Sequence, residues 1–245
     1  MRDRWTYNAD HRKRPNLHPV AAPTGAVLTR DAPDDHPWHH GLWFTIKYVN
    51  GENFWEEQPP YGVLRHRDAN AIEWLRPDRE TVVIDETCAL EHVDLADDAY
   101  AIDITIRITP RVDVVLDTTP FTTWGGYSGL ALRGRPDWID TRILLADGTE
   151  HERVLGAASA WCDLSGAIDG THAGVLVIPA VETPWYGSTR AATYGDEGWS
   201  NFLNAAFLWN GPVSLAAGET MPFDYRVVVH DGIWSRDRCA TYALA

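Results

Sequence analysis

The stretch AIDITIRIT (residues 101–109) decides the fold class of this chain, because its apolar and polar residues alternate strictly. One face of the extended segment carries four isoleucines: Ile102, Ile104, Ile106 and Ile108. The opposite face carries three polar residues: Asp103, Thr105 and Arg107. A period of two residues with one apolar face is typical of an antiparallel strand that packs one side against a core. The stretch therefore predicts such a strand.

Similar stretches recur along the chain and favour an all-β fold. They are LWFTIKY (42–48), ETVVID (80–85), RVDVVLD (111–117), GVLVIP (174–179) and DYRVVVH (224–230). Glycine-containing turn signals separate many of them: VNGEN (49–53), ADGTE (146–150), AIDGT (167–171) and AAGET (216–220). Only DEGWSNFLNAAFLW (196–209) has some helical character, and it could equally be a loop over the sheet. The pattern predicts one domain over residues 1–245, a large antiparallel β-sandwich of the supersandwich or jelly-roll type.

Charge and hydropathy argue against two classes of partner. The formal net charge is -14, so most of the surface would repel a nucleic-acid backbone. The early basic stretch RDRWTYNADHRKR (2–14) has no apolar run, so it is neither a signal peptide nor a membrane span. No window approaches the roughly 18 uninterrupted apolar residues that a spanning helix needs. We therefore expect a soluble protein without nucleic-acid or membrane partners.

The cysteines indicate the compartment. Cys88, Cys162 and Cys239 are odd in number, lie far apart in the chain and form no CxxC pair. This usage favours reduced, buried thiols in a cytoplasmic protein over a disulfide framework or a structural zinc site. The oligomeric state stays open, with a homo-oligomer as one alternative.

The segment DHPWHHGLWF (35–44) is the strongest candidate for chemistry, because it holds three of the ten histidines beside a carboxylate and two tryptophans. If the chain is extended or turns at Pro37, His36 and His39 converge while His40 points away. Imidazole titrates near neutral pH and serves as a general acid or base, which favours catalysis or substrate binding. Metal binding and plain packing remain alternatives, since no diagnostic ligand spacing such as HExxH is present.

Three further segments supply candidate partners. NFWEEQPPYG (53–62) places Glu56 and Glu57 after an aromatic pair, and on a strand only one of the two could enter a site. RHRD (65–68) sets His66 between two arginines, which could fix an anionic or ketone-bearing substrate or simply protect an exposed edge. RPNLHP (14–19) contributes His18.

The tryptophan content points to a ligand with apolar faces. The chain has 12 tryptophans, whereas ordinary usage would give about three. Such an excess builds a thick aromatic core or offers rings to a sugar, whose hydroxyls carboxylates can bind.

The order of the segments resembles the PmoA-like family, whose members are often labelled methane oxygenase PmoA. The similarity is carried by RPNLHPVAAPTGAVLTRD, DHPWHHGLWF, VNGENFWEE, LRH, GGYSGLALR, WCDLSGAIDGTHAGVLVI and GETMPFDYRVVVHDG, and it runs from about residue 14 to 232. The resemblance implies a β-sandwich similar to galactose mutarotase and an association with carbohydrate catabolism. It implies no oxygenase chemistry, because the chain has neither a membrane span nor a haem or iron–sulfur ligand pattern.

The motif positions carry over as a set of site residues: His18, Asp35, His36, His39, Glu56 and His66. His40 departs from the family pattern, which has arginine there, so an anion-binding arginine could be lost. The segment 183–204 also diverges, which indicates its own substrate preference.

We expect a carbohydrate-active enzyme that uses His/Glu acid–base chemistry on a sugar or oxidised sugar derivative, as an epimerase, lyase or hydrolase. The expected catalytic residues are His36, His39 and Glu56. The expected substrate-binding residues are His18, Asp35, Trp38, Trp55 and His66. No cofactor is expected. The alternatives are a non-catalytic carbohydrate-binding β-sandwich, and a metalloprotein whose ligands are His36 and His39 with His66, His18 or Glu56.

Overall fold

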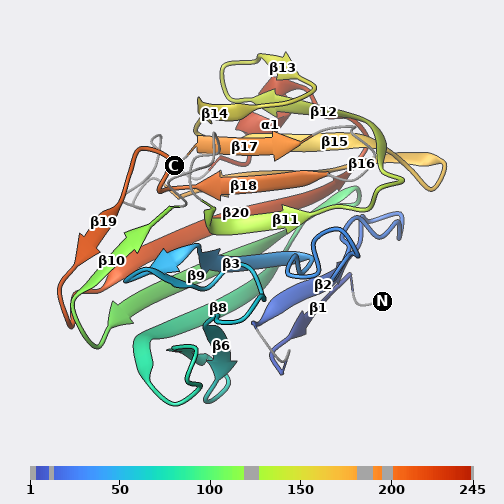
Figure 1. Cartoon of the computed structure of the whole chain (residues 1–245). Coiled ribbons are helices and arrows are strands. Elements are labelled where there is room, and N and C mark those ends of the chain that lie inside the picture. The colour runs from blue at the N-terminus through green and yellow to red at the C-terminus, as the bar shows by residue number, and fades with distance from the viewer. Residues whose placement is uncertain (1–3, 11–13, 119–126, 181–189, 195–200, 244–245) are drawn as a thin grey trace.

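Two large antiparallel sheets packed face to face form the body of the protein (Figure 1). The computed structural model describes residues 4–10, 14–118, 127–180, 190–194 and 201–243. One interior cluster of buried apolar side chains draws on both sheets, which makes the molecule a sandwich around a shared core. The predicted all-β, antiparallel sandwich is confirmed.

The seven-stranded sheet lies in front in Figure 1 and contains the strand that follows the histidine-rich segment 35–41. Its strands in spatial order are β1 (Trp5–Asn8), β2 (Asn16–Val20), β3 (Leu42–Ile46), β11 (Ser128–Arg133), β18 (Phe202–Ala206), β17 (Arg190–Tyr194) and β14 (Leu155–Ala158). All neighbouring strands in this sheet pair antiparallel.

The nine-stranded sheet lies behind it. Its strands in spatial order are β13 (Glu150–His151), β12 (Ile139–Leu145), β15 (Cys162–Ile168), β16 (Thr171–Pro179), β20 (Met221–Asp231), β9 (Ala99–Pro110), β8 (Val82–Ala96), β7 (Ala71–Leu75) and β6 (Val63–His66). A small third sheet runs in the order β19 (Val213–Leu215), β10 (Val114–Asp117), β4 (Tyr48–Val49) and β5 (Glu52–Asn53).

Strand β9 contains the isoleucine stretch and lies between β20 and β8 near the middle of the nine-stranded sheet. Its four isoleucines are at most 3% exposed and belong to the interior cluster, as the alternation predicts. On the opposite face, Arg226 of β20 makes two hydrogen bonds to its cross-strand neighbour Asp103. The polar side of the pattern is thus used for cross-strand ion pairs.

One local expectation changes, and a short helix is added. Residues 202–206 form strand β18 rather than a helix or loop, because alternate side chains are needed on the two faces of a sheet that is covered on both sides. The helix α1 (Arg236–Ala240) lies in the C-terminal extension, where Ser235 caps its first turn. None of the helices in the described ranges is long and apolar enough to span a bilayer.

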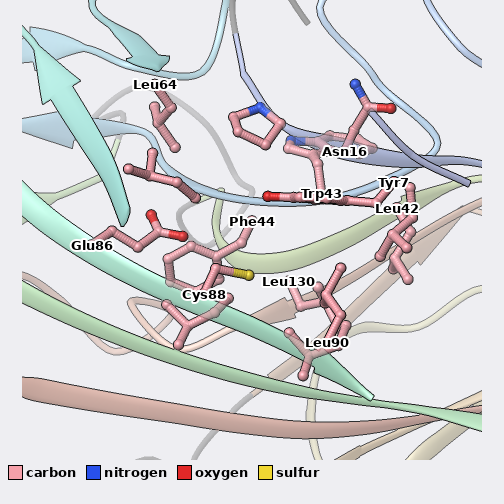
Figure 2. A pocket seen from close by; sticks show the side chains of 15 residues that line it. Tyr7, Asn16, Leu42, Trp43, Phe44, Leu64, Glu86, Cys88, Leu90 and Leu130 are labelled. Carbon is pink, nitrogen blue, oxygen red and sulfur yellow. The ribbon is translucent and has the colours of Figure 1, made fainter. Parts of the chain in front are cut away.

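A small cavity of about 30 Å³ lies between the two sheets, in the half of the sandwich that contains β1 and β8. Figure 2 shows the carboxyl group of Glu86 and the thiol of Cys88 among apolar side chains such as Phe44 and Leu64. Glu86 is 3% exposed, and Trp74 Nε1 donates to it at 2.6 Å. Burial raises the pKa of Glu86 to about 8 despite the opposing hydrogen bond from Trp74. The core therefore contains an acid that favours its neutral form.

This acid predicts a pH-dependent stability. Because the pKa of Glu86 is raised to about 8 in the folded state, the folded protein holds a proton that the unfolded chain releases above its ordinary pKa of 4.5. The free energy of unfolding then falls as the pH rises from about 5 to about 8, by a few kcal/mol in order of magnitude. Glu86→Gln keeps an acceptor for Trp74 and removes this loss. Urea denaturation at several pH values would contradict the expectation if both proteins showed the same pH dependence.

Candidate functional site

The outer face of the seven-stranded sheet carries a second, aromatic cluster. On β3 the even positions point into the sandwich, whereas Trp43 lies on the outer side with Ala131 of β11 and Phe202 of β18. Trp43 and Ala131 are cross-strand partners, and the small alanine leaves room for the large rings beside it. Trp55 packs 5.6 Å from Trp43 between ring centroids and completes a buried aromatic floor. The floor consists of Trp43, Trp55, Ala131 and Phe202.

The loop before β3 brings two histidines onto this floor. His36 to His39 form a β-turn in which the His39 amide donates to the His36 carbonyl at 2.9 Å, with Pro37 at the position that proline favours. The loop closes through the Asp31–His40 bridge. Gly41 follows with a φ of +61°, and a Cβ there would lie 2.4 Å from the Leu17 carbonyl oxygen. Only glycine fits this entry into the strand.

His36 and His39 converge, as the turn at Pro37 predicts. Their rings stack with centroids 4.7 Å apart, and His39 also stacks on Phe202 at 5.1 Å. Trp38 stands edge-on to His36 at 5.3 Å and is half-buried. The turn thus presents one partly exposed imidazole and one indole above a buried imidazole.

The two histidines have opposite partners. His36 Nδ1 donates to Asp35 Oδ2 at 2.8 Å, and the same oxygen accepts from Arg133 Nη2. Arg133 Nη1 donates to His39 Nδ1 at 3.4 Å. The guanidinium of Arg133 is 0% exposed and links both pairs from β11.

The contacts of His39, Asp35 and Arg133 determine how the pKa of each side chain is shifted. Burial, followed by the neighbouring His36 and Arg133, holds the pKa of His39 well below its usual range, so His39 is neutral. Partial burial would raise the pKa of Asp35, but hydrogen bonds from His36 and Arg133 outweigh it and lower that pKa. Burial lowers the pKa of Arg133, and Asp35 opposes the change. Asp35 is therefore an ionised acceptor.

His40 points away from His36 and His39 into a buried charge cluster. Its Nδ1 lies 2.7 Å from Asp31 Oδ1, and its Nε2 lies 2.8 Å from Glu57 Oε1. Arg14 Nε lies 3.8 Å from the same Glu57 oxygen, and Arg14 Nη2 donates to the Trp55 carbonyl at 2.7 Å. Burial lowers the pKa of Arg14 to about 10. His40 thus joins the loop to the segment after β5.

Glu56 follows Trp55 of the floor in the chain and is paired with the buried Lys47. The side chain of Asn53 holds the turn, since its Oδ1 accepts from the amides of Trp55 and Glu56 at 2.8 and 3.1 Å. Glu56 and Glu57 lie in a loop rather than on a strand, so the strand-based expectation does not apply; they take different partners, Lys47 and His40. Tyr127 stacks on Trp55 at 4.8 Å and covers it.

The remaining predicted residues are placed less centrally. His18 Nδ1 lies 3.0 Å from Thr29 Oγ1, and burial lowers the pKa of His18, with Asp31 and His40 nearby. His66 lies elsewhere, on β6, where its Nε2 is 2.7 Å from the Tyr7 hydroxyl. Strand β6 belongs to the nine-stranded sheet, whereas His39 packs on Phe202 of the seven-stranded sheet. Within the described ranges, no group of three or more His, Cys, Asp or Glu side chains could hold a metal ion.

The structure thus unites Asp35, His36, Trp38, His39 and Trp55. Glu56 follows Trp55 directly in the chain and pairs with Lys47, the residue after β3. Trp55 is fully buried and supports the floor rather than exposing a ring.

The sequence did not predict five residues that contribute to this region: Arg133, Lys47, Arg14, Tyr127 and Phe202. Lys47 continues the odd-numbered outer side of LWFTIKY, and Arg133 that of SGLALR, so alternation could have found both. Most of the divergent segment 183–204 lies outside the described residues.

The contacts of His40 predict a structural role. His40→Leu removes the imidazole that lies 2.8 Å from the buried Glu57 carboxylate, so the free energy of unfolding should fall by about 3–5 kcal/mol. His36→Ala is the matched control, because its ring is 29% exposed, and it should cost about 1 kcal/mol. Urea denaturation at pH 7 measures both values. Equal losses in the two variants would contradict the distinction.

Comparison with known proteins places the chain at the level of a family. A search of curated proteins found no match to this sequence. A family model described as a family of unknown function, DUF6807, matches residues 2–244, which is nearly the whole chain. This protein is therefore a member of the DUF6807 family.

Proposed function

We propose that this protein is a carbohydrate-active enzyme that uses His36 and Glu56 as acid–base groups on a sugar or oxidised sugar derivative. The observation that carries the proposal is an Asp35–His36 pair and a Glu56–Lys47 pair beside one aromatic floor on the outer face of the seven-stranded sheet. An acid and a base over a common surface are what epimerisation, β-elimination and hydrolysis require.

The floor and the turn suit a sugar ring. Trp38 is the tryptophan of this region that keeps partial exposure, whereas Trp43 and Trp55 are buried beneath. An indole covers the apolar face of a sugar, while carboxylates and imidazoles bind its hydroxyls. Asp35 and His36 stand next to Trp38 and can serve that purpose.

The chemistry of each group follows from its partner. Because Asp35 holds His36 Nδ1, His36 exchanges protons through Nε2, and the carboxylate stabilises the imidazolium that forms. Glu56 is 22% exposed and pairs with Lys47, an arrangement that suits a role as base or hydroxyl acceptor. His18 and His66 lie outside this arrangement and take no catalytic part in the proposal.

The resemblance to PmoA-like proteins supports the same assignment, since it implies a galactose-mutarotase-like sandwich and a place in carbohydrate catabolism. A cytoplasmic setting, as the cysteines indicate, is part of the proposal. A non-catalytic sugar-binding role would use the same floor, but it gives no reason for an Asp–His pair with a buried arginine behind it.

The test combines turnover with two variants. Wild-type protein is incubated with a panel of aldoses, ketoses, aldonic acids and uronic acids, and products are followed by NMR. His36→Ala and Glu56→Gln should each lower turnover of the converted sugar by about 10²–10⁴-fold, with unchanged circular dichroism. The matched controls His172→Ala and Glu80→Gln change exposed residues and should keep full activity.

Full activity in both site variants would contradict the proposed roles. Calorimetric binding of a panel sugar without any product would support the non-catalytic alternative instead.

A further inference from the structure

His36 and His39, the stacked histidines of the turn, lie in different environments. Each ring uses Nδ1 toward a charged group, and the two charged groups have opposite signs: Asp35 for His36 and Arg133 for His39. A carboxylate only accepts and a guanidinium only donates. The proton of His36 therefore lies on Nδ1 and that of His39 on Nε2.

Arg133 is built into the sheet in a way that fixes this difference. It ends β11 on the outer face, opposite Phe202 of β18, and its guanidinium is fully buried. One terminal nitrogen donates to Asp35 and the other to His39, so a single rigid fork spans the two pairs. A side chain of this kind holds both rings to one geometry.

The surroundings of His39 point the same way. The titratable or charged groups that act on it are His36 of the turn, Arg133 of β11, Arg14 of the segment before β2, and the adjacent His40. None of these four is a carboxylate, and each opposes a second proton on the ring. Its other neighbours are the rings of Trp38, Trp43, Trp55 and Phe202. His39 keeps 4% exposure, and no described residue accepts a hydrogen bond from Nε2.

We propose that Arg133 is a positioning residue that gives the two histidines different roles. It holds His39 as a permanent Nε2–H donor, and it holds Asp35 and His36 as the pair that transfers the proton. The division follows from the fork of Arg133, the stacking distance and the opposite partners at Nδ1. A neutral imidazole keeps the same donor across the working pH range, whereas an imidazole beside a carboxylate can take up and release a proton.

The consequence for the reaction rests on the proposed function. His36 Nε2 removes one proton from the substrate, the electron pair passes to a substrate oxygen, and that oxygen accepts a hydrogen bond from His39 Nε2–H. Asp35 balances the imidazolium, which in the second half of the reaction gives the proton to that oxygen, so that the negative charge is neutralised and His36 is regenerated. The favoured substrates are sugar derivatives in which the departing proton is bound to, or adjacent to, an oxygen-bearing centre that can take negative charge.

The test needs no substrate, so its failure is distinguishable from failure of the proposed function. Long-range ¹H–¹⁵N NMR of the full-length protein reports the tautomer of each histidine, assigned with His36→Ala as reference. The expected tautomers of the neutral rings are Nδ1–H for His36 and Nε2–H for His39. The measurement on the wild type is sufficient to overturn the proposal: an Nδ1–H tautomer of His39, or a His39 that carries two protons at pH 7, would do so.

Variants then test the role of Arg133. Arg133→Gln should let His39 sample both tautomers and shift its protonation midpoint upward by about one pH unit or more. Arg133→Lys should restore the wild-type tautomer in part. A purely structural role predicts a loss of stability in both variants with the tautomer of His39 unchanged, which would also overturn the proposal.

If the Arg133 variants do not fold, Asp35→Asn provides the second measurement, because Asp35 is partly exposed. It should alter the tautomer population of His36 and leave His39 as the Nε2–H form. A change at His39 equal to that at His36 would contradict the division.

Discussion

Burial of both faces of β3, β11 and β18, the central strands of the seven-stranded sheet, is the constraint on which the rest of the structure depends. The inner positions of β3 and β11 join the apolar core between the sheets, and the outer positions carry Trp43, Ala131 and Arg133. Because successive side chains on a strand alternate between faces, any residue at an outer position must find partners there. Apolar residues form the floor, and the cations Arg133 and Lys47 are buried beside it. The site is therefore a second, partly charged layer outside the sandwich.

The buried charges organise that layer. An ion removed from water needs a partner and hydrogen bonds, since an unpaired buried charge is strongly destabilising. Arg133 meets Asp35, Lys47 meets Glu56, and Arg14 and His40 share Glu57. All of these carboxylates come from two loops, 31–41 and 54–57, so the pairs fasten both loops to the sheet. The same pairs hold Asp35 and Glu56 in place, so stability and the proposed chemistry use the same residues.

Local pattern predicted the part of this arrangement that depends on neighbours in sequence. The isoleucines of β9 gave the strand, and Pro37 gave the turn that stacks His36 on His39 and turns His40 away. The local pattern could not predict which residues far apart in the sequence are partners. Arg133 is about a hundred residues from the turn, and its role follows only from the pairing of β3 with β11. His66 was grouped with the site because its segment follows closely in sequence, yet β6 lies at the edge of the other sheet. Glu86 occupies an inward position on a strand where alternation predicts an apolar residue, and nothing in the sequence indicates that Trp74 would hold it.

The central claim is that the outer face above Trp43, Trp55 and Phe202 is where a sugar binds. The most direct measurement is a crystal structure of the full chain soaked with individual monosaccharides, keto-sugars and sugar acids. We expect the bound sugar to lie against Trp38, within hydrogen-bonding distance of His36 Nε2 and of the Glu56 carboxylate. A sugar bound only in another part of the molecule, such as the cavity beside Glu86, or no sugar at saturating concentration for any member of the panel, would contradict it.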